Sequence, residues 1–260
     1  MLINQLTNTL CQQFQVQRLS QEISNSSQWI ALSEKIDTDF LILAYQHGVF
    51  PWPMGEEYKI PWVSPIDRGV ILTEEFHVAN SLKKMINKLK PTIYFNRNFN
   101  QVIEYCQHSP TRKDISTWIN QEIITAYKRL FEKNYAYCIE VENQVGVLIG
   151  GLYGVCINGI ISGESMFYLS DGGSKIALVA LMNQVKKAKI PLIDTQMTTP
   201  VVALNGGREI ERVEYLKWVE KLGHLKIKRE EIFPPSINYI QSQMHSFLPY
   251  VSGEYSIRIR

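Results

Sequence analysis

The sequence predicts an α+β protein in which a mixed β-sheet is flanked by helices and preceded by a smaller N-terminal unit. From Tyr135 onward the segments follow the order strand, strand, strand, helix, strand, which indicates a mixed sheet. The chain has 260 residues and is 45% apolar, which suits one large hydrophobic core and a second small one. We therefore expect a small unit over residues 1–66 and a larger domain over residues 67–260.

The N-terminal unit is expected to contain an arm and one short helix. Residues 1–28 are polar and rich in Gln, Asn and Ser, which is typical of an arm rather than of a core. Apolar residues at helical spacing predict a helix over residues 37–46, which ends at Gly48. The proline-containing run at residues 50–53 cannot continue that helix.

Strands and helices alternate through the first part of the larger unit. Short runs rich in β-branched and aromatic residues predict strands, and apolar residues at helical spacing predict helices. The expected strands are residues 70–72, 92–95 and 135–141. The expected helices are residues 99–106, residues 120–132 and the lysine-rich segment between the first two strands.

A β-hairpin follows these elements. Residues 146–155 and 160–167 both favour strands, and the pair Asn158-Gly159 between them is typical of a two-residue hairpin turn. Glu164 lies in the second strand among apolar neighbours. We therefore do not expect Glu164 to be an ordinary solvated charge.

A buried helix and a polar strand complete the predicted sheet. Residues 171–174 supply turn and N-cap chemistry for an almost wholly apolar helix over residues 174–187. Residues 190–196 then favour a strand, and alternation of side chains places Asp194 and Gln196 on the same face. Two polar groups on one face of a central strand need partners, so this strand is a candidate site.

Composition excludes several classes of protein. The net charge of +2 does not by itself indicate a nucleic-acid-binding protein. Four cysteines without a CxxC pair or a zinc-type histidine spacing predict buried thiols in a reducing compartment, and we expect neither a metal nor a cofactor. The N-terminus lacks the features of a signal peptide, and no run reaches the roughly 18 apolar residues of a membrane span. We therefore expect a cytoplasmic protein with no membrane partner.

Six short motifs occur in one order along the chain. They are HGVFPW (residues 47–52), WVSP (62–65), TWI (117–119), GGLYGV (150–155), GESMF (163–167) and IDTQ (193–196). In this order they resemble the bacterial leucyl/phenylalanyl-tRNA–protein transferases from about residue 29 to 220. The resemblance implies a small N-terminal domain and a larger acetyltransferase-like (GNAT-type) domain. It also implies transfer of Leu or Phe, with Met as a further donor, from aminoacyl-tRNA to an N-terminal Arg or Lys, which marks the acceptor protein for degradation.

The chemistry of this reaction needs placement more than a strong base, because an aminoacyl ester is already activated toward an amine. A carboxamide oxygen is too weak a base to take up a proton, so Gln196 is expected to accept a hydrogen bond and aim the attacking amine. Asp194 would orient that amide or relay its proton, the joint role that the resemblance also implies. Glu164 could hold an ammonium group of donor or acceptor. The alternative for all three residues is a satisfied structural role within the sheet.

The resemblance also implies residues that bind the donor. Five apolar residues occupy the positions of the donor side-chain pocket, although by residue type alone each would be assigned to the core. They are Leu152, Met166, Leu178, Leu181 and Ile193. Three aromatic residues occupy positions that stack on or border the terminal adenosine and the acceptor, with burial in the core as the alternative. They are Trp52, Trp118 and Tyr127.

Two lysine clusters could contact tRNA phosphates or simply form a solvated helix face. The first contains Lys83, Lys84 and Lys88, and the second is residues 186–189. The resemblance favours the first cluster, because family members carry a basic segment after the position of His77. Leu-tRNA or Phe-tRNA and proteins with N-terminal Arg or Lys are thus the expected partners.

Other functions stay open at this point. Val63 and Thr195 replace a tryptophan and a cysteine that are common in the family, and further departures lie at the rim of the motifs. They allow a diverged aminoacyl-tRNA-dependent transferase with another donor or a small-molecule amine acceptor. An acyl-CoA-dependent acetyltransferase is disfavoured because the chain shows no convincing RxxGxG/A phosphate loop. A non-catalytic tRNA- or peptide-binding module is disfavoured because Glu164, Asp194 and Gln196 are all retained.

Overall fold

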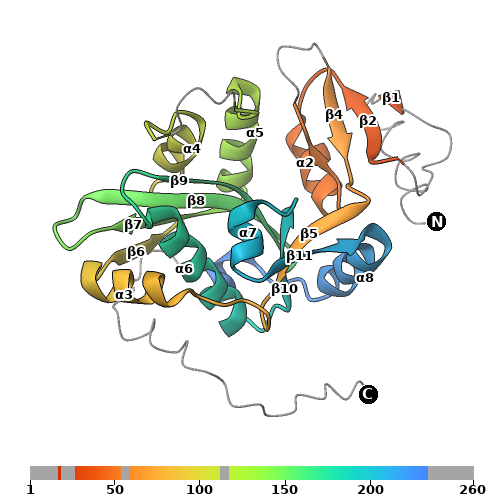
Figure 1. Cartoon of the computed structure of the whole chain (residues 1–260). Coiled ribbons are helices and arrows are strands. Elements are labelled where there is room, and N and C mark those ends of the chain that lie inside the picture. Colours follow the sequence, from red (N-terminus) through yellow and green to blue (C-terminus); the bar gives the residue numbers. More distant parts are fainter. Residues whose placement is uncertain (1–16, 19–26, 54–58, 112–116, 234–260) are drawn as a thin grey trace.

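The computed structural model describes residues 17–18, 27–53, 59–111 and 117–233, which form two β-sheets with helices packed around them (Figure 1). The expected N-terminal arm lies outside the described residues except for residues 17–18 and 27–28. No helix in the described ranges is long and apolar enough to cross a membrane.

The smaller sheet is antiparallel and has the strand order β1-β2-β4-β3. Its strands are β1 (Gln17–Arg18), β2 (Trp29–Ser33), β3 (Phe50–Pro51) and β4 (Ile60–Val63). Helix α2 (Thr38–Tyr45) begins at Asp37, whose carboxylate accepts hydrogen bonds from the N–H groups of Asp39 and Phe40 at 2.9 and 3.0 Å. The predicted helix over residues 37–46 is therefore confirmed, with a side-chain cap at its start.

The larger sheet is mixed, as predicted, and has the order β11-β5-β10-β9-β8-β7-β6. Only β9 and β10 pair in parallel among these strands, and helix α6 forms the crossover between them. Its strands are β5 (Asp67–Leu72), β6 (Thr92–Phe95), β7 (Ala136–Glu142), β8 (Leu148–Ile157), β9 (Ile160–Tyr168), β10 (Leu192–Gln196) and β11 (Gly207–Glu211). Every strand predicted in the larger unit is present within two residues of its expected bounds or as part of a longer strand.

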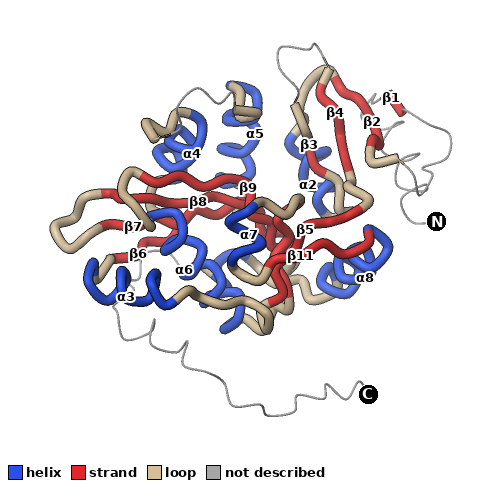
Figure 2. The backbone as a smooth tube through the Cα atoms, viewed as in Figure 1, coloured by secondary structure: helices blue, strands red, loops and turns tan. Residues whose placement is uncertain are grey.

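Helices cover both faces of the larger sheet. Figure 2 shows α4 and α5 on one side of strands β7 to β9 and α3 and α6 on the other. The helices are α3 (Asn80–Leu89), α4 (Phe99–Gln107), α5 (Gln121–Glu132), α6 (Gly173–Lys187), α7 (Pro200–Leu204), α8 (Arg212–Gly223) and α9 (Arg229–Ile232). One hydrophobic cluster lies between α6 and the sheet, and a second joins α4, α5 and the opposite face of the sheet to α2 and the smaller sheet. The smaller sheet therefore shares a core with the larger one.

The hairpin turn is confirmed, but the expected side-chain cap of α6 is wrong. Asn158 and Gly159 both have positive φ, +51° and +84°, as a two-residue turn between twisted strands requires. Helix α6 instead begins at Gly172, which has φ of +80° and no capping side chain. A Cβ on Gly173 would lie 2.0 Å from the carbonyl oxygen of Ile149. The start of α6 therefore packs directly on the β8 backbone, where no side chain fits.

Candidate active site

Irregularities in two neighbouring strands mark the candidate site. The pairing of β9 with β8 skips Glu164, and the pairing of β10 with β5 skips Thr195. A β-bulge of this kind re-aims the side chains around it and is frequent beside active sites. Because β9 and β10 are adjacent, both bulges lie in the same region of the sheet.

The backbone turns sharply at the end of β10, so the expected strict alternation through Thr195 is wrong. Gln196 has a left-handed φ of +63°, and its main-chain N–H donates to Oδ1 of Asp194 at 2.9 Å. Gly69 lies opposite Gln196 in the pairing with β5. A Cβ on Gly69 would be 2.4 Å from the carbonyl carbon of Met197, so only glycine allows the chain to fold over β5 at this point.

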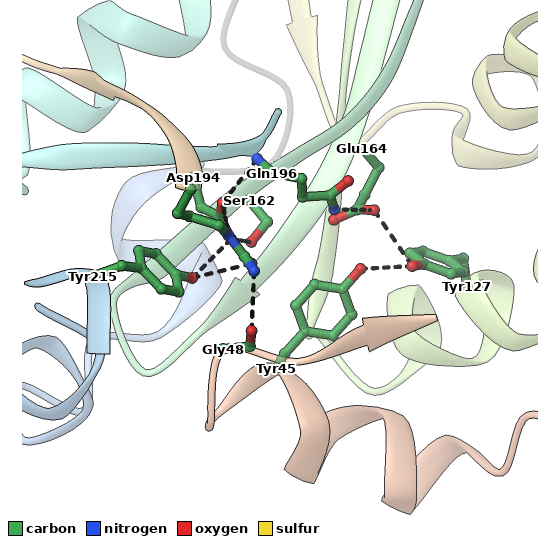
Figure 3. A network of polar contacts seen from close by, with 9 residues as sticks. Tyr45, Gly48, Tyr127, Ser162, Glu164, Asp194, Gln196 and Tyr215 are labelled. Atoms are coloured by element: carbon green, nitrogen blue, oxygen red, sulfur yellow. Dashed lines mark hydrogen bonds and ion pairs between the residues drawn. The ribbon is translucent and has the colours of Figure 1, made fainter. Parts of the chain in front are cut away.

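Asp194 is completely buried and fully hydrogen-bonded (Figure 3). Arg68 donates to both of its carboxylate oxygens, from Nε at 2.7 Å and from Nη2 at 2.5 Å. The hydroxyls of Tyr215 and Ser162 donate to Oδ2 at 2.7 and 3.1 Å. With the N–H of Gln196 this carboxylate accepts five hydrogen bonds, which is typical of an anion held in one fixed orientation.

Arg68 is held as firmly as its partner. Its Nη1 donates to the carbonyl oxygen of Gly48 at 3.0 Å, in the turn that follows α2. The guanidinium also lies over the rings of Phe50 and Tyr215, at 4.7 and 4.3 Å from their centroids. Burial by itself would lower the pKa of Arg68, but the neighbouring charge of Asp194 raises it, so the guanidinium stays charged.

Glu164 lies in a different environment on the other side of Gln196. Its Oε2 accepts from Nε2 of Gln196 at 2.8 Å and from the hydroxyl of Tyr127 at 3.4 Å. The Tyr127 hydroxyl is in turn 2.6 Å from that of Tyr45 on α2. Oε1 is buried and has no hydrogen-bond partner among the described residues. Burial raises the pKa of Glu164 to about 7, against the opposing effect of the hydrogen bond from Gln196.

The orientation of the Gln196 amide follows from these contacts. Nε2 of Gln196 donates to Glu164 and Oε1 faces away, which is the orientation that the ionised carboxylate requires because it only accepts hydrogen bonds. No residue in the described part of the chain donates to this oxygen. Asp194 contacts the main chain of Gln196 and not its side-chain amide. Among the described contacts, Asp194 thus holds the main chain of Gln196, while Glu164 holds its side-chain amide.

Unsatisfied polar atoms gather in the same region. Buried side-chain atoms without a hydrogen-bond partner in the described ranges include Oε1 of Glu164 and the hydroxyls of Thr195 and Thr198. Native proteins leave few such atoms, and each needs a partner that a bound molecule can provide. The end of β10 is therefore suited to bind a polar ligand.

The three expected aromatic residues differ in their exposure. Trp52 and Trp118 are partly buried, and Trp52 packs edge-on against Phe50 with the centroids 5.9 Å apart. Tyr127 is 0% exposed and lies among the rings of Tyr45, Trp118 and Tyr153. Its ring is buried among these neighbours, and its hydroxyl reaches Oε2 of Glu164.

The five expected pocket residues come together in one hydrophobic cluster. Leu152 and Met166 are paired across β8 and β9, Leu178 and Leu181 lie on α6, and Ile193 precedes Asp194 on β10. All but Met166 are at most 7% exposed. They belong to the core of this structure, and Met166 is the member that keeps accessible surface.

The two lysine clusters both lie on helix surfaces. Lys83, Lys84 and Lys88 are exposed on α3, whose opposite face buries Leu82 and Ile86. In the second cluster, Lys186 and Lys187 are exposed in the last turn of α6. Both lysine clusters are exposed, so exposure does not indicate which of them contacts tRNA phosphates.

Metal-ligating groups and thiols are two further kinds of candidate site among the described residues. No group of three His, Cys, Asp or Glu within the described ranges is arranged to hold a metal ion. The cysteines of this part of the chain, Cys106, Cys138 and Cys156, are buried. Burial raises the pKa of Cys156 to about 12, which keeps that thiol protonated and weakly nucleophilic.

Four residues of the site were missed by the sequence analysis: Tyr45, Arg68, Ser162 and Tyr215. The sequence indicates that Asp194 needs hydrogen-bond partners, but it does not indicate which residues they are. A weak signal existed for Arg68, because it precedes an apolar strand and alternation places it on the same face as Val70, which is completely buried. The two tyrosines carried no signal that distinguished them from other core aromatics.

Comparisons with known proteins agree on one family. Residues 70–220 match the family described as leucyl/phenylalanyl-tRNA protein transferase, and residues 34–66 match its N-terminal domain. A protein with that name from Colwellia psychrerythraea is 39% identical over 187 residues, covering 70% of this chain and 77% of its own. Another from Pseudomonas fluorescens is 37% identical over 204 residues, covering 78% and 88%. A third, from Desulforapulum autotrophicum, is 40% identical over 187 residues, covering 72% and 81%.

Among solved structures, L-PGS from Bacillus licheniformis overlaps 74% of this chain and 72% of its own, with 12% identity and a TM-score of 0.37. This likeness is too low to carry an argument about fold or function.

Proposed function

Because this chain belongs to the leucyl/phenylalanyl-tRNA–protein transferase family and is therefore an aminoacyltransferase, we propose that it moves Leu or Phe from aminoacyl-tRNA to the N-terminal Arg or Lys of acceptor proteins. Met is a further donor in this proposal, and degradation of the product is its biological consequence. One observation supports it most directly. The amide of Gln196 is held by Glu164 through its nitrogen, which leaves its oxygen available to an incoming amine.

In the proposed reaction the α-amine of the acceptor attacks the aminoacyl ester carbon. A C–N bond forms, the C–O bond to the tRNA ribose breaks, and the amine proton ends on the released hydroxyl. The α-amine of a peptide has a pKa near 8, so a useful fraction is neutral at cellular pH. Gln196 Oε1 would accept a hydrogen bond from this amine and aim its lone pair at the ester, which is a positioning contribution.

The proposed role of Asp194 is to hold Gln196 in place. Its carboxylate accepts five hydrogen bonds, including the ion pair with Arg68, and no oxygen lone pair is left for a substrate. These contacts favour orientation over the alternative role of proton relay. The side chain of Gln196 then stays in one position while substrates bind.

Glu164 is proposed to hold an ammonium group of the donor or the acceptor. Its unpartnered Oε1 supports this role, because an N–H group of a substrate would satisfy it. The carboxylate must be ionised to bind an ammonium group, and its pKa of about 7 makes that ionisation depend on pH in the cellular range.

The donor amino acid is proposed to contact the cluster around Met166. Leu152, Leu178, Leu181 and Ile193, on β8, α6 and β10, belong to the hydrophobic cluster against which Met166 packs, and Leu152 is its cross-strand partner. Met is flexible and polarizable, which suits a site that accepts both a branched and a flat side chain. Trp52 and Trp118 keep partly exposed rings, which supports contact with the terminal adenosine or the acceptor.

For the architecture we propose an N-terminal domain over residues 1–66 and a GNAT-type transfer domain over residues 67–260, acting in the cytoplasm. The smaller sheet ends at Val63 and the larger sheet begins at Asp67, which supports a boundary between them. The mixed sheet with a helical crossover between β9 and β10 supports the GNAT-type assignment.

An assay of substrate mixtures tests the proposed function. The purified chain would receive tRNAs charged with all amino acids and peptides that begin with Arg, Lys or Ala. We expect the Arg and Lys peptides to gain the mass of Leu or Phe, and only in the presence of charged tRNA. A product with the mass of another amino acid would support the diverged transferase instead. Product formed from acetyl-CoA without tRNA would refute tRNA-dependent transfer.

Replacing Lys83, Lys84 and Lys88 with Ala is expected to weaken tRNA binding. Contacts to phosphates carry no sequence information, so different tRNAs should lose affinity about equally. Each lost contact should reduce the slope of log affinity against log salt concentration by about one unit. Filter binding over a range of salt concentrations measures both effects. The matched control replaces Lys186 and Lys187, and an unchanged slope in the α3 variant would assign its lysines to a solvated face.

A further inference from the structure

The geometry points to Arg68 as a positioning residue for the transfer reaction: we propose that it fixes Gln196 through Asp194 and anchors both to the turn after α2. This inference rests on the proposed function, because it assigns Gln196 to the reacting amine. Arg68 itself is buried behind Asp194 and touches no substrate in this proposal. Its effect is carried by two hydrogen-bonded steps within the protein.

The first step joins Arg68 to Asp194. Two parallel N–H···O bonds of 2.7 and 2.5 Å connect the planar guanidinium to the two carboxylate oxygens. This fork geometry fixes the rotation of the carboxylate as well as its distance, which a lysine ammonium cannot do. The rings of Phe50 and Tyr215 lie against the guanidinium and prevent it from tilting.

The second step joins Asp194 to the backbone of Gln196. A residue other than glycine with φ of +63° is in a strained conformation that needs support from its surroundings. The hydrogen bond from its N–H to Oδ1 of Asp194 provides that support. If the carboxylate could rotate, Gln196 would be free to leave the left-handed region, and its amide would lose the 2.8 Å contact with Glu164.

The turn after α2, to which Arg68 is anchored, lies in the N-terminal part of the chain. Arg68 donates to the carbonyl of Gly48, and Gly48 packs so closely on Tyr215 that a Cβ would be 2.8 Å from that ring. Tyr45, three residues earlier, reaches Glu164 through the Tyr127 hydroxyl. One turn of the N-terminal part therefore supports both sides of Gln196, as Figure 3 shows.

Arg68→Lys tests the proposal, because it keeps the charge and removes the fork. We expect kcat to fall about tenfold, while KM for charged tRNA changes by less than about twofold. Hydrogen exchange of the Gln196 main-chain amide should accelerate at least about tenfold, a readout that does not depend on activity. The control is Arg97→Lys, which removes two hydrogen bonds to one carboxylate oxygen of buried Glu140, three strands away from β10, and should change neither quantity.

A double variant separates positioning from general damage. If Arg68 acts through Gln196, adding Arg68→Lys to Gln196→Ala should lower kcat little beyond the loss caused by Gln196→Ala alone. Two results would overturn the proposal. One is a kcat of the double variant that falls by the product of the two single losses, and the other is an unchanged hydrogen-exchange rate of the Gln196 main-chain amide. If Arg68→Lys does not fold, Tyr215→Phe takes its place in the comparison with Gln196→Ala. This substitution removes the 2.7 Å hydrogen bond from Tyr215 to Asp194, and we expect a smaller loss of kcat. A wild-type chain without transfer activity would refute the proposed function, whereas the exchange experiment would still decide whether Arg68 holds Gln196.

Discussion

Gln196→Ala is expected to lower kcat about 100-fold, with KM for charged tRNA within about twofold of the wild type. The substitution removes the amide oxygen that would aim the attacking amine, and it leaves the residues proposed to bind tRNA unchanged. A loss of orientation acts mainly in the transition state, so it appears in kcat and not in binding. Single-turnover transfer to an Arg-initiated peptide, together with tRNA titration, measures the two quantities separately.

The matched control for this prediction is Gln107→Ala. Gln107 also uses its amide as a hydrogen-bond donor, to the carbonyl of Ile119 at 2.9 Å, but it lies on α4 outside the site. We expect near-normal kcat in this control. Turnover of Gln196→Ala close to that of the control would remove Gln196 from the mechanism, whatever the geometry around it.

Glu164→Gln is expected to stabilise the protein at neutral and alkaline pH while it impairs transfer. The pKa of Glu164 is raised by burial to about 7 in the folded protein, against 4.5 for an ordinary glutamate. Between these values the folded state binds more protons than the unfolded state, so the free energy of unfolding falls as pH rises. Above pH 7 the accumulated cost is roughly 3 kcal/mol, which a neutral amide of the same shape avoids.

Denaturant unfolding at pH 5 and pH 8 measures this effect. The free energy of unfolding of the wild type should fall more between these two pH values than that of Glu164→Gln, by up to roughly 3 kcal/mol. Other titrating groups cancel in the difference between the two proteins. The control is Glu104→Gln, at an exposed carboxylate beside Lys128, which should behave as the wild type does. An equal pH dependence in the wild type and Glu164→Gln would mean that Glu164 is ionised at no cost to folding.

The pH dependence of transfer depends on the same carboxylate. Burial raises the pKa of Glu164 to about 7, whereas it raises the pKa values of the neighbouring Tyr45, Tyr127 and Tyr215 well above their ordinary range, and the charge of Asp194 keeps Arg68 protonated. The charged form binds an ammonium group, so wild-type activity should rise with pH through about 7. The pH profile of Glu164→Gln should lack the rise in activity near pH 7. It should keep only the rise caused by deprotonation of the acceptor amine.

Local sequence patterns determined most of the elements of this protein. Asn158-Gly159 specifies its hairpin because both residues tolerate the positive φ that the turn needs. The apolar composition of α6 indicates a helix buried on all sides, and Asp37 caps α2 as its residue type suggests. The same kind of information identified Glu164, Asp194 and Gln196, since a charge or an amide inside an apolar strand requires a partner.

Only the tertiary structure decided which partners those residues have. Arg68 and Asp194 are 126 positions apart, and they meet because β5 and β10 are neighbours in the larger sheet. The bulges at Glu164 and Thr195 interrupt the regular pairing of β9 and β10, which alternation along a single strand does not predict. Strand order, register and close approach at Gly69 depend on packing between distant segments. A periodic pattern along one segment reports which face is buried, and it carries no information on what lies across from that face.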